Sequence, residues 1–238
     1  GVHLRPIAVP ARERWPRNDH PNFYWLQEDL LRARAGKREF DFTIWRPQVI
    51  FGDALGVAMN VMPVIGAYAA ICREEGRPFA FPGGPAYVLE AVDARLLARA
   101  IAWGATTEAA RNETFNITNG DVFAWPNVWP AIADALGMPQ AAPEPFSLAE
   151  FLPAKADVWD RIVRKHDLLP LKLSDMLGES HHYADYLFAL GAKSTPSPKI
   201  VSTIKLRRAG FGDCIDTEDM FRDWFAILQR NRILPPKA

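Results

Sequence analysis

The sequence is short of several features that would assign a chain to a class at once. Its 28 basic residues balance its 28 acidic ones, so the formal net charge is zero. Neither nucleic acid nor an anionic membrane is therefore predicted as an electrostatic partner. The longest apolar stretch, residues 57–72, is broken by polar, proline and glycine residues and is too short to span a bilayer. No secretory signal is recognised in the opening residues, and a cytoplasmic location is expected.

Cysteine is also scarce. Cys72 and Cys214 are the two cysteines of the chain, and neither lies in a Cys-x-x-Cys pair or beside a histidine cluster. We expect both to be buried apolar residues instead of disulfide partners or metal ligands. The adjacent pair His181 and His182 is interpreted as packing or surface residues on a helix, so no metal site is predicted.

A glycine-rich turn is missing as well. No Gly-x-x-Gly-x-x-Gly motif follows a predicted strand, and Gly83 and Gly84 come late and without a strand–helix–strand context. A loop that could hold the pyrophosphate of a dinucleotide is therefore not expected within this sequence. The first twenty residues are rich in proline and arginine and predict an irregular connector, so a further segment is expected before Gly1.

The pattern of the first half alternates helices and strands. A helix is predicted from residue 23 to Gly36, followed by a strand over residues 40–45. Pro47 cannot donate to a sheet ladder and should end this strand. This order is typical of an α/β fold with a parallel sheet. The predicted helix buries apolar residues three and four positions apart, namely Phe23, Leu26, Leu30 and Ala33.

Further elements follow from local signals. A mostly apolar helix is predicted over residues 60–73, and Asp93 should cap another that starts at residue 94. Three prolines in residues 139–145 indicate a linker, after which the chain is mainly helical. The last part holds predicted helices over residues 157–166 and 174–190 and one capped at Asp216.

Three local patterns resemble one family. Residues 22–29, Asn-Phe-Tyr-Trp-Leu-Gln-Glu-Asp, are similar to the NFYYxxED signature of the progesterone 5β-reductase/iridoid synthase-like reductases. Residues 46–52, Arg-Pro-Gln-Val-Ile-Phe-Gly, resemble a loop after the sixth strand of extended short-chain dehydrogenases. Residues 112–125 are similar to the family's NExFNxxNGDxFxW stretch, the most specific of the three. The resemblance covers nearly the whole chain and is weakest in its last third.

The resemblance implies an α/β fold: a partial Rossmann-type parallel sheet, its N-terminal half missing, with a mainly helical C-terminal substrate-binding lobe. Residues 1–138 would be the C-terminal part of the extended reductase's Rossmann domain, and residues 139–238 the lobe. The cofactor would be NADP(H), with its glycine-rich loop and the catalytic lysine expected before Gly1. The substrate would be a small hydrophobic enone, enal or carbonyl compound. The oligomeric state, a homodimer included, stays open.

The resemblance also assigns the chemistry. Members of the family reduce activated C=C bonds by 1,4-hydride addition, which places negative charge on a carbonyl oxygen and calls for a hydrogen-bond donor there. Tyr24 matches the catalytic phenol at the first aromatic position of the signature. The second position is Trp25 here, so a family mechanism that used that position would leave this chain inactive.

Other family positions imply binding residues. Pro47 and Ile50 match the loop beside the nicotinamide ring, where the backbone of Ile50 would bind the carboxamide. Val57, Ala58 and Met59 match a segment that contacts the cofactor, and Met59 would also face the substrate. Tyr183 falls where the family has an aromatic residue over the substrate. Each position also has a plain structural explanation: a tyrosine at a helix start, a strand-ending proline, or a core isoleucine or methionine.

Two other hypotheses are kept beside the enone reductase. One is an extended short-chain enzyme of another reaction, such as a sugar-nucleotide epimerase, a dehydratase or a carbonyl reductase. Those enzymes usually place a lysine four residues after the catalytic tyrosine, where this chain has Glu28. The other is a non-catalytic remnant that binds a hydrophobic ligand or a partner and lacks the cofactor loop.

Overall fold

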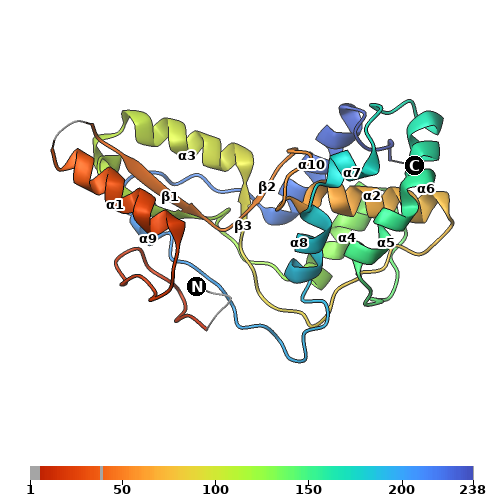
Figure 1. Cartoon of the computed structure of the whole chain (residues 1–238), viewed down its shortest axis with the longest axis horizontal. Helices are drawn as coiled ribbons and strands as arrows, with labels where there is room; N and C mark the ends of the chain where they lie inside the picture. Colours follow the sequence, from red (N-terminus) through yellow and green to blue (C-terminus); the bar gives the residue numbers. More distant parts are fainter. Residues whose placement is uncertain (1–5, 38–39, 238) are drawn as a thin grey trace. The chain divides into compact units, whose positions relative to one another are not determined.

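The structure is a computed structural model that describes residues 6–37 and 40–237 (Figure 1). It divides into two units that interleave along the sequence. Unit 1 comprises Gly1–Ile50, Val88–Val122 and Ser197–Ile215, and unit 2 comprises Phe51–Tyr87, Phe123–Pro196 and Asp216–Ala238. The boundary that the sequence suggests at residue 138 stays a prediction about the family's domain organisation.

Unit 1 combines short strands with helices. Strands β1 and β4 pair in parallel, from Thr43 opposite Glu113 to Pro47 opposite Ile117, and β2 pairs with β3. The parallel pairing confirms the predicted α/β class. The elements are α1 (Phe23–Ala35), β1 (Thr43–Pro47), β2 (Val49–Phe51, whose last residue belongs to unit 2), β3 (Ala91–Asp93), α3 (Ala94–Thr106), the 3-10 turn η1 (Glu108–Ala110), β4 (Glu113–Ile117) and α9 (Ile204–Arg208).

The two faces of the β1–β4 pair have different chemistry because side chains alternate along a strand. On one face, Trp45 and Phe115 pack against Trp103 of α3, which runs along β1 in Figure 1. On the other face, Arg46 and Thr114 form hydrogen bonds with α1. The apolar core therefore lies under α3, and the polar face is left for α1. The buried core residues are Leu96, Ala100, Ala110, Phe115, Ile117, Leu206 and Phe211.

Helix α1 begins and ends near the predicted residues, but its predicted buried face is wrong. Phe23, Leu26 and Leu30 are 61%, 74% and 59% exposed. The residue that α1 buries is Glu28. The physical reason is the partner: the sheet face under α1 presents the guanidinium of Arg46, which a carboxylate neutralises and an apolar side chain cannot.

Local signals in unit 1 predict its boundaries well. Strand β1 ends at Pro47, as expected, although it begins at Thr43 and not at residue 40. Asp93 caps α3 by accepting a hydrogen bond from the backbone N–H of Arg95 at 2.7 Å. The Asp93 side chain and the missing N–H of Pro47 each affect only backbone groups within a few residues. These two boundaries therefore do not depend on the rest of the fold.

Unit 2 is mainly helical and is built around α2. Twelve of the fourteen residues of α2 are buried, which confirms the predicted apolar helix. Among the described residues, no helix is both long and apolar enough to cross a membrane. The elements are α2 (Val61–Glu74), α4 (Trp125–Ala135), α5 (Leu148–Phe151), the 3-10 turn η2 (Pro153–Lys155), α6 (Ala156–Lys165), α7 (Leu173–Leu177), α8 (Ser180–Leu187) and α10 (Thr217–Arg230).

Two other predictions differ from the structure. The single helix expected over residues 174–190 is divided into α7 and α8 by Gly178, whose φ is +50°. A Cβ atom at Gly178 would lie 2.6 Å from the backbone of Gly56, so the chain turns where a passing segment leaves no room. Cys72 is buried as expected, but Cys214 is exposed because it lies in an irregular segment between α9 and α10.

Asn60 fixes the turn that leads into α2. Its Oδ1 accepts a hydrogen bond from the backbone N–H of Met62 at 3.2 Å and so caps the helix. Its Nδ2 donates to the carbonyls of Gly52 and Ala54 at 2.9 and 2.8 Å. One buried amide therefore satisfies three backbone groups, and the segment from residue 52 to 60 is held from within.

We expect Asn60→Ala to lower the free energy of unfolding by about 3 kcal/mol, since it removes a cap and leaves two carbonyls without donors. Asp216→Ala is the matched control, because Asp216 caps α10 from an exposed position and its side chain forms no further hydrogen bond or ion pair with the described residues. It should cost about 1 kcal/mol. Urea unfolding of the full chain measures both. Equal losses in the two variants would contradict the threefold role of Asn60.

Glu90, just before β3, gives unit 1 a dependence on pH. Its carboxylate is buried and accepts a hydrogen bond from the backbone N–H of Val201 at 2.8 Å. Burial raises the pKa of Glu90 from 4.5 to about 7. Because the folded state holds this proton more tightly than the unfolded state, stability is greatest below the unfolded pKa and is lost as the pH rises to about 7.

The expected loss between pH 4.5 and pH 7 is about 3 kcal/mol, from the size of the shift. Glu90→Gln keeps an acceptor for Val201 and cannot ionise, so it should flatten this part of the stability curve. Urea unfolding of both proteins across this pH range is the measurement. An unchanged slope in the variant would show that other groups cause the dependence.

Candidate functional site

Tyr24 lies in the first turn of α1. The side chain of Asn22 caps this turn and accepts a hydrogen bond from the backbone N–H of Tyr24 at 3.0 Å. The phenol ring is 56% exposed and rests on Phe23, with ring centroids 4.1 Å apart. Within residues 6–37 and 40–237, the phenol hydroxyl forms no hydrogen bond. A rigid cap thus presents a phenol whose donor is available.

One turn after Tyr24, Glu28 ties α1 to the sheet. Its two carboxylate oxygens lie 2.8 and 2.9 Å from Nη2 of Arg46 on β1. Arg17 approaches from the N-terminal segment, with its Nη2 at 3.1 Å from Oε2. The Glu28 side chain is 9% exposed and both arginines are about one third exposed. This ion cluster fixes the helix that carries Tyr24.

Trp25 completes the same cluster. The guanidinium carbon of Arg17 lies 4.9 Å from the centroid of the indole, and that of Arg46 lies 5.9 Å away. The two cations therefore contact the aromatic ring of Trp25 while they bind Glu28. The second aromatic position of the signature is thus a packing position in this chain, whereas the first is open to solvent.

A pocket of about 410 Å³ lies beside this cluster in unit 1. Asn22 and Trp25 of the α1 start line it together with Pro47 and Gln48 of the loop after β1. The amide of Gln48 donates to the carbonyl of Lys199 at 2.9 Å and steadies that loop. The structure therefore brings Pro47 next to the signature motif. Tyr24 and Ile50 are not among the residues that line the pocket.

In unit 2, the segment Val57–Met59 presents apolar side chains to solvent. Val57 and Met59 are 40% and 62% exposed. The backbone of this segment is held by α8 and the end of α7: Ser180 Oγ donates to the carbonyl of Val57 at 2.6 Å, and the N–H of Gly56 donates to the carbonyl of Met176 at 2.9 Å. Met59 is therefore a surface residue on a fixed backbone, and not a core methionine.

Tyr183 lies on α8 and is half-buried. Its ring stacks on that of Tyr186, with centroids 6.0 Å apart and planes 26° apart. Burial, and secondarily the neighbouring phenol of Tyr186, raises the pKa of Tyr183 to about 12. The hydroxyl of Tyr183 therefore stays protonated at neutral pH and remains a hydrogen-bond donor.

The predicted residues are distributed over both units, with Tyr24, Pro47 and Ile50 in unit 1 and Val57, Ala58, Met59 and Tyr183 in unit 2. Sequence reasoning missed the cluster that holds Tyr24. In the sequence, Glu28 was noted only because extended epimerases usually have lysine at that position. Arg46 was noted only as part of the motif that contains Pro47. The available signal was that the motif on the predicted helix contains two carboxylates, Glu28 and Asp29, whereas the motif at the end of the predicted strand contains one guanidinium, that of Arg46.

The residues present fit one end of a dinucleotide. In unit 2, Val57 and Met59 offer apolar side chains that are 40% and 62% exposed, and in unit 1 Ile50 is 39% exposed. Exposed apolar side chains of this kind suit a nicotinamide ring. The sequence contains no glycine-rich turn for the pyrophosphate, so the fit extends to the nicotinamide end and no further.

Similar proteins of known name are plant enzymes. An (S)-8-oxocitronellyl enol synthase of Camptotheca acuminata is 32% identical over 245 residues, which cover 98% of this chain and 61% of that protein. The enzyme of the same name from Antirrhinum majus is 38% identical over 179 residues, or 72% of this chain and 46% of its own length. A 3-oxo-Δ(4,5)-steroid 5β-reductase of Arabidopsis thaliana is 32% identical, covering 95% of this chain and 58% of its own length.

Solved structures show the same fold at low identity. A UDP-glucose 4-epimerase of Thermotoga maritima, solved with UDP-glucose, matches with a TM-score of 0.59 at 13% identity, covering 95% of this chain and 59% of the epimerase. A Pseudomonas aeruginosa protein, RMD, solved with NADPH matches with a TM-score of 0.58 at 11% identity, covering 93% of this chain and 60% of that one. These neighbours establish a Rossmann-type fold.

The similarity is to part of each relative, since the chain spans about half to three fifths of the length of the curated relatives it matches. No family model matches the sequence. The signature at residues 22–29, the parallel β1–β4 pair and the named relatives nevertheless agree. The chain belongs to the progesterone 5β-reductase and iridoid synthase-like reductases, within the extended short-chain dehydrogenases/reductases.

Proposed function

We propose that this protein is an NADPH-dependent oxidoreductase that reduces the activated C=C bond of a small apolar enone or enal by 1,4-addition. The observation that carries the proposal is the phenol of Tyr24. It stands at a capped helix start, more than half exposed, with a hydroxyl that forms no hydrogen bond within the described residues. The names of the plant relatives, which include a steroid 5β-reductase, support a reductase of this kind.

When bound, the cofactor supplies a hydride to the β-carbon of the substrate. The role of the chain is to stabilise the charge that this creates. The Tyr24 hydroxyl donates a hydrogen bond to the substrate carbonyl, and the bond strengthens as the oxygen becomes an enolate. A donor placed in advance is worth about 3–4 kcal/mol in the transition state. A proton from solvent then completes the product at the α-carbon.

The binding roles follow from exposure and rigidity. The cofactor contacts are proposed for each unit by itself: Pro47 and Ile50 in unit 1, which would lie beside the nicotinamide ring, and Val57, Ala58 and Met59 in unit 2. The backbone of the second group is held by Asn60 and Ser180, so little ordering entropy is lost on binding. Met59 and the protonated phenol of Tyr183 would contact the substrate.

Two features favour this reaction over that of an extended epimerase or dehydratase. Glu28 occupies the position four residues after Tyr24, where those enzymes usually have lysine. Its carboxylate binds Arg46 and Arg17, so the position serves to fix the helix. Trp25 is packed against the same arginines, which supports Tyr24 as the functional phenol of the signature.

We expect Tyr24→Phe to slow NADPH oxidation by a small enal by about a hundredfold, and by at least tenfold, since deleting such a donor costs about 3 kcal/mol in the transition state. Steady-state absorbance measures this on the complete protein that the gene encodes, because the present sequence contains no glycine-rich turn for the pyrophosphate of NADPH. Urea unfolding of Tyr24→Phe is the control, because the phenol of Tyr24 is exposed and its loss should leave the free energy of unfolding unchanged. Unchanged turnover in Tyr24→Phe would remove this phenol from the mechanism.

The position of the phenol can be tested separately with a double variant. Trp25→Tyr in the Tyr24→Phe background restores a phenol at the second position of the signature. It should not restore activity, because that side chain faces the two arginines. Recovery to near the parent rate would show that the second position serves the reaction and that Tyr24 is dispensable.

Glu28→Gln should lower both stability and turnover. It leaves Arg17 and Arg46 without a counter-charge, and a loss of about 2 kcal/mol is expected because these arginines are partly solvated. Arg99→Gln breaks the exposed ion pair with Asp213 and should cost below about 0.5 kcal/mol. Urea unfolding and kcat are measured on the same samples. A Glu28→Gln protein as stable and active as the parent would show that the cluster does not position Tyr24.

A further inference from the structure

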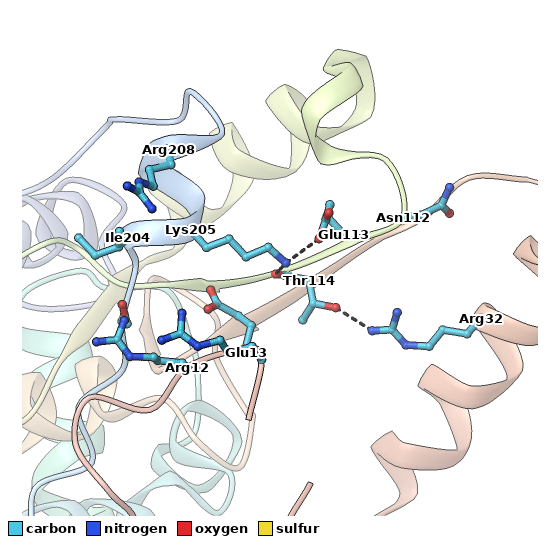
Figure 2. A pocket seen from close by; sticks show the side chains of 11 residues that line it. Arg12, Glu13, Arg32, Asn112, Glu113, Thr114, Ile204, Lys205 and Arg208 are labelled. Carbon is cyan, nitrogen blue, oxygen red and sulfur yellow. Dashed lines mark hydrogen bonds and ion pairs between the residues drawn. The ribbon is translucent and has the colours of Figure 1, made fainter. Parts of the chain in front are cut away.

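A second pocket of unit 1, of about 420 Å³, has no part in the proposed reaction. It is formed by the N-terminal segment, α1, the start of β4 and α9 (Figure 2). Five cationic side chains line it: Arg12, Arg14, Arg32, Lys205 and Arg208. Two carboxylates, those of Glu13 and Glu113, line it as well, so the five positive charges exceed the two negative ones by three.

The two carboxylates are already engaged. Glu113 accepts a hydrogen bond from Nζ of Lys205 at 2.5 Å, and this pair is drawn as a dashed line in Figure 2. Lys205 also donates to the carbonyl of Thr114 at 2.9 Å. Glu13 accepts from the backbone N–H of Asn116 at 2.9 Å. Glu113 is therefore neutralised by Lys205, whereas Glu13 keeps its negative charge and forms no ion pair with an arginine of the pocket among the described residues.

The arginines are left with free donors. The guanidinium groups of Arg12, Arg14 and Arg208 form no hydrogen bond or ion pair with any residue that the structure describes. Arg32 donates to Oγ1 of Thr114 at 2.9 Å, a neutral acceptor. A guanidinium carries five N–H donors in a planar fork. Several such forks around one concave space, with no acidic partner, form a site for an anion.

The geometry of these groups favours a phosphate. Arginine forks bind phosphate and carboxylate oxygens in pairs, and several arginines together suit the higher charge of a phosphate. The volume exceeds that of a single phosphate ion, and Ile204 at the wall is 52% exposed. An apolar wall beside a cationic one fits an organic group attached to the anion. A long nucleic acid is disfavoured, because the chain as a whole carries no net charge.

This pocket adjoins the one beside Pro47, because Arg12 lines both, but none of the residues proposed for the cofactor lines it. It includes Glu113 at the start of β4, which lies opposite Thr43, whereas Pro47 lies opposite Ile117 at the other end of the strand pair. Four residues of strand separate the two ends, or about 13 Å. Pro47, Ile50 and Tyr24 are not among the residues that line it.

We propose that this pocket binds the phosphate group of a small organic phosphate, held by Arg12 and Arg208 with Arg14 and Arg32 beside them. The site would be present whatever reaction the protein catalyses, because it uses none of the proposed catalytic or cofactor residues.

Isothermal titration of the full chain with inorganic phosphate and with glycerol 3-phosphate, at constant ionic strength, tests the proposal. Both should bind saturably at one site. Arg12→Gln and Arg208→Gln should each weaken binding about tenfold or more, as expected for loss of a charge-assisted pair. Arg207→Gln is the matched control: Arg207 is the neighbouring residue of α9 but does not line the pocket, and the change in net charge is the same. Its effect should stay within about twofold.

Several results would overturn the proposal. Absence of saturable binding for both phosphates would do so, and so would an equal loss of affinity in Arg207→Gln, which would indicate a diffuse field. A single-stranded oligonucleotide that binds more tightly than either phosphate and weakens equally in all three variants would assign the surface to a polyanion instead. Tyr24→Phe should bind phosphate like the parent, so failure of the reductase proposal and failure of this one are distinguishable.

Discussion

The candidate site depends on one buried carboxylate. Glu28 faces a sheet surface that carries a guanidinium, and it is held there by both oxygens. A buried carboxylate is tolerated only when a group of opposite charge forms hydrogen bonds with it, as Arg46 does here with both oxygens. The consequence is geometric: once Glu28 is fixed on β1, the turn of α1 that precedes it is fixed as well. The apolar residues of the helix then face outward, and with them the phenol of Tyr24.

Much of the fold could be predicted from the sequence because many of its boundaries are set locally. Asp93 and Asp216 cap helices through their own side chains, and Pro47 ends a strand through its missing N–H. The apolar run that becomes α2 is uniform enough to need no partner for its assignment. In each case the deciding interaction lies within a few residues of the signal.

The failures share the opposite cause. The buried face of α1 is decided by Arg46, eighteen residues away, and the break between α7 and α8 by Gly56, more than a hundred residues away. The spacing of apolar residues along a helix does not predict a charge on another element. It also does not predict that the backbone of a distant segment passes close by. For the site, motifs predicted which positions matter. They could not show that Glu28 and Trp25 support the phenol while Tyr24 itself is open to solvent.

The contact between Gly178 and Gly56 has a consequence for how this chain can vary. Both positions have positive φ, and a Cβ at either one would meet backbone atoms of the segment opposite. Neither clash can be relieved by moving a side chain, since the obstacle in both cases is main chain. In a library of all substitutions at these two positions, we expect only glycine to be accepted at either one. The close backbone contact at these glycines therefore also fixes the conformation of the surface loop that carries Met59.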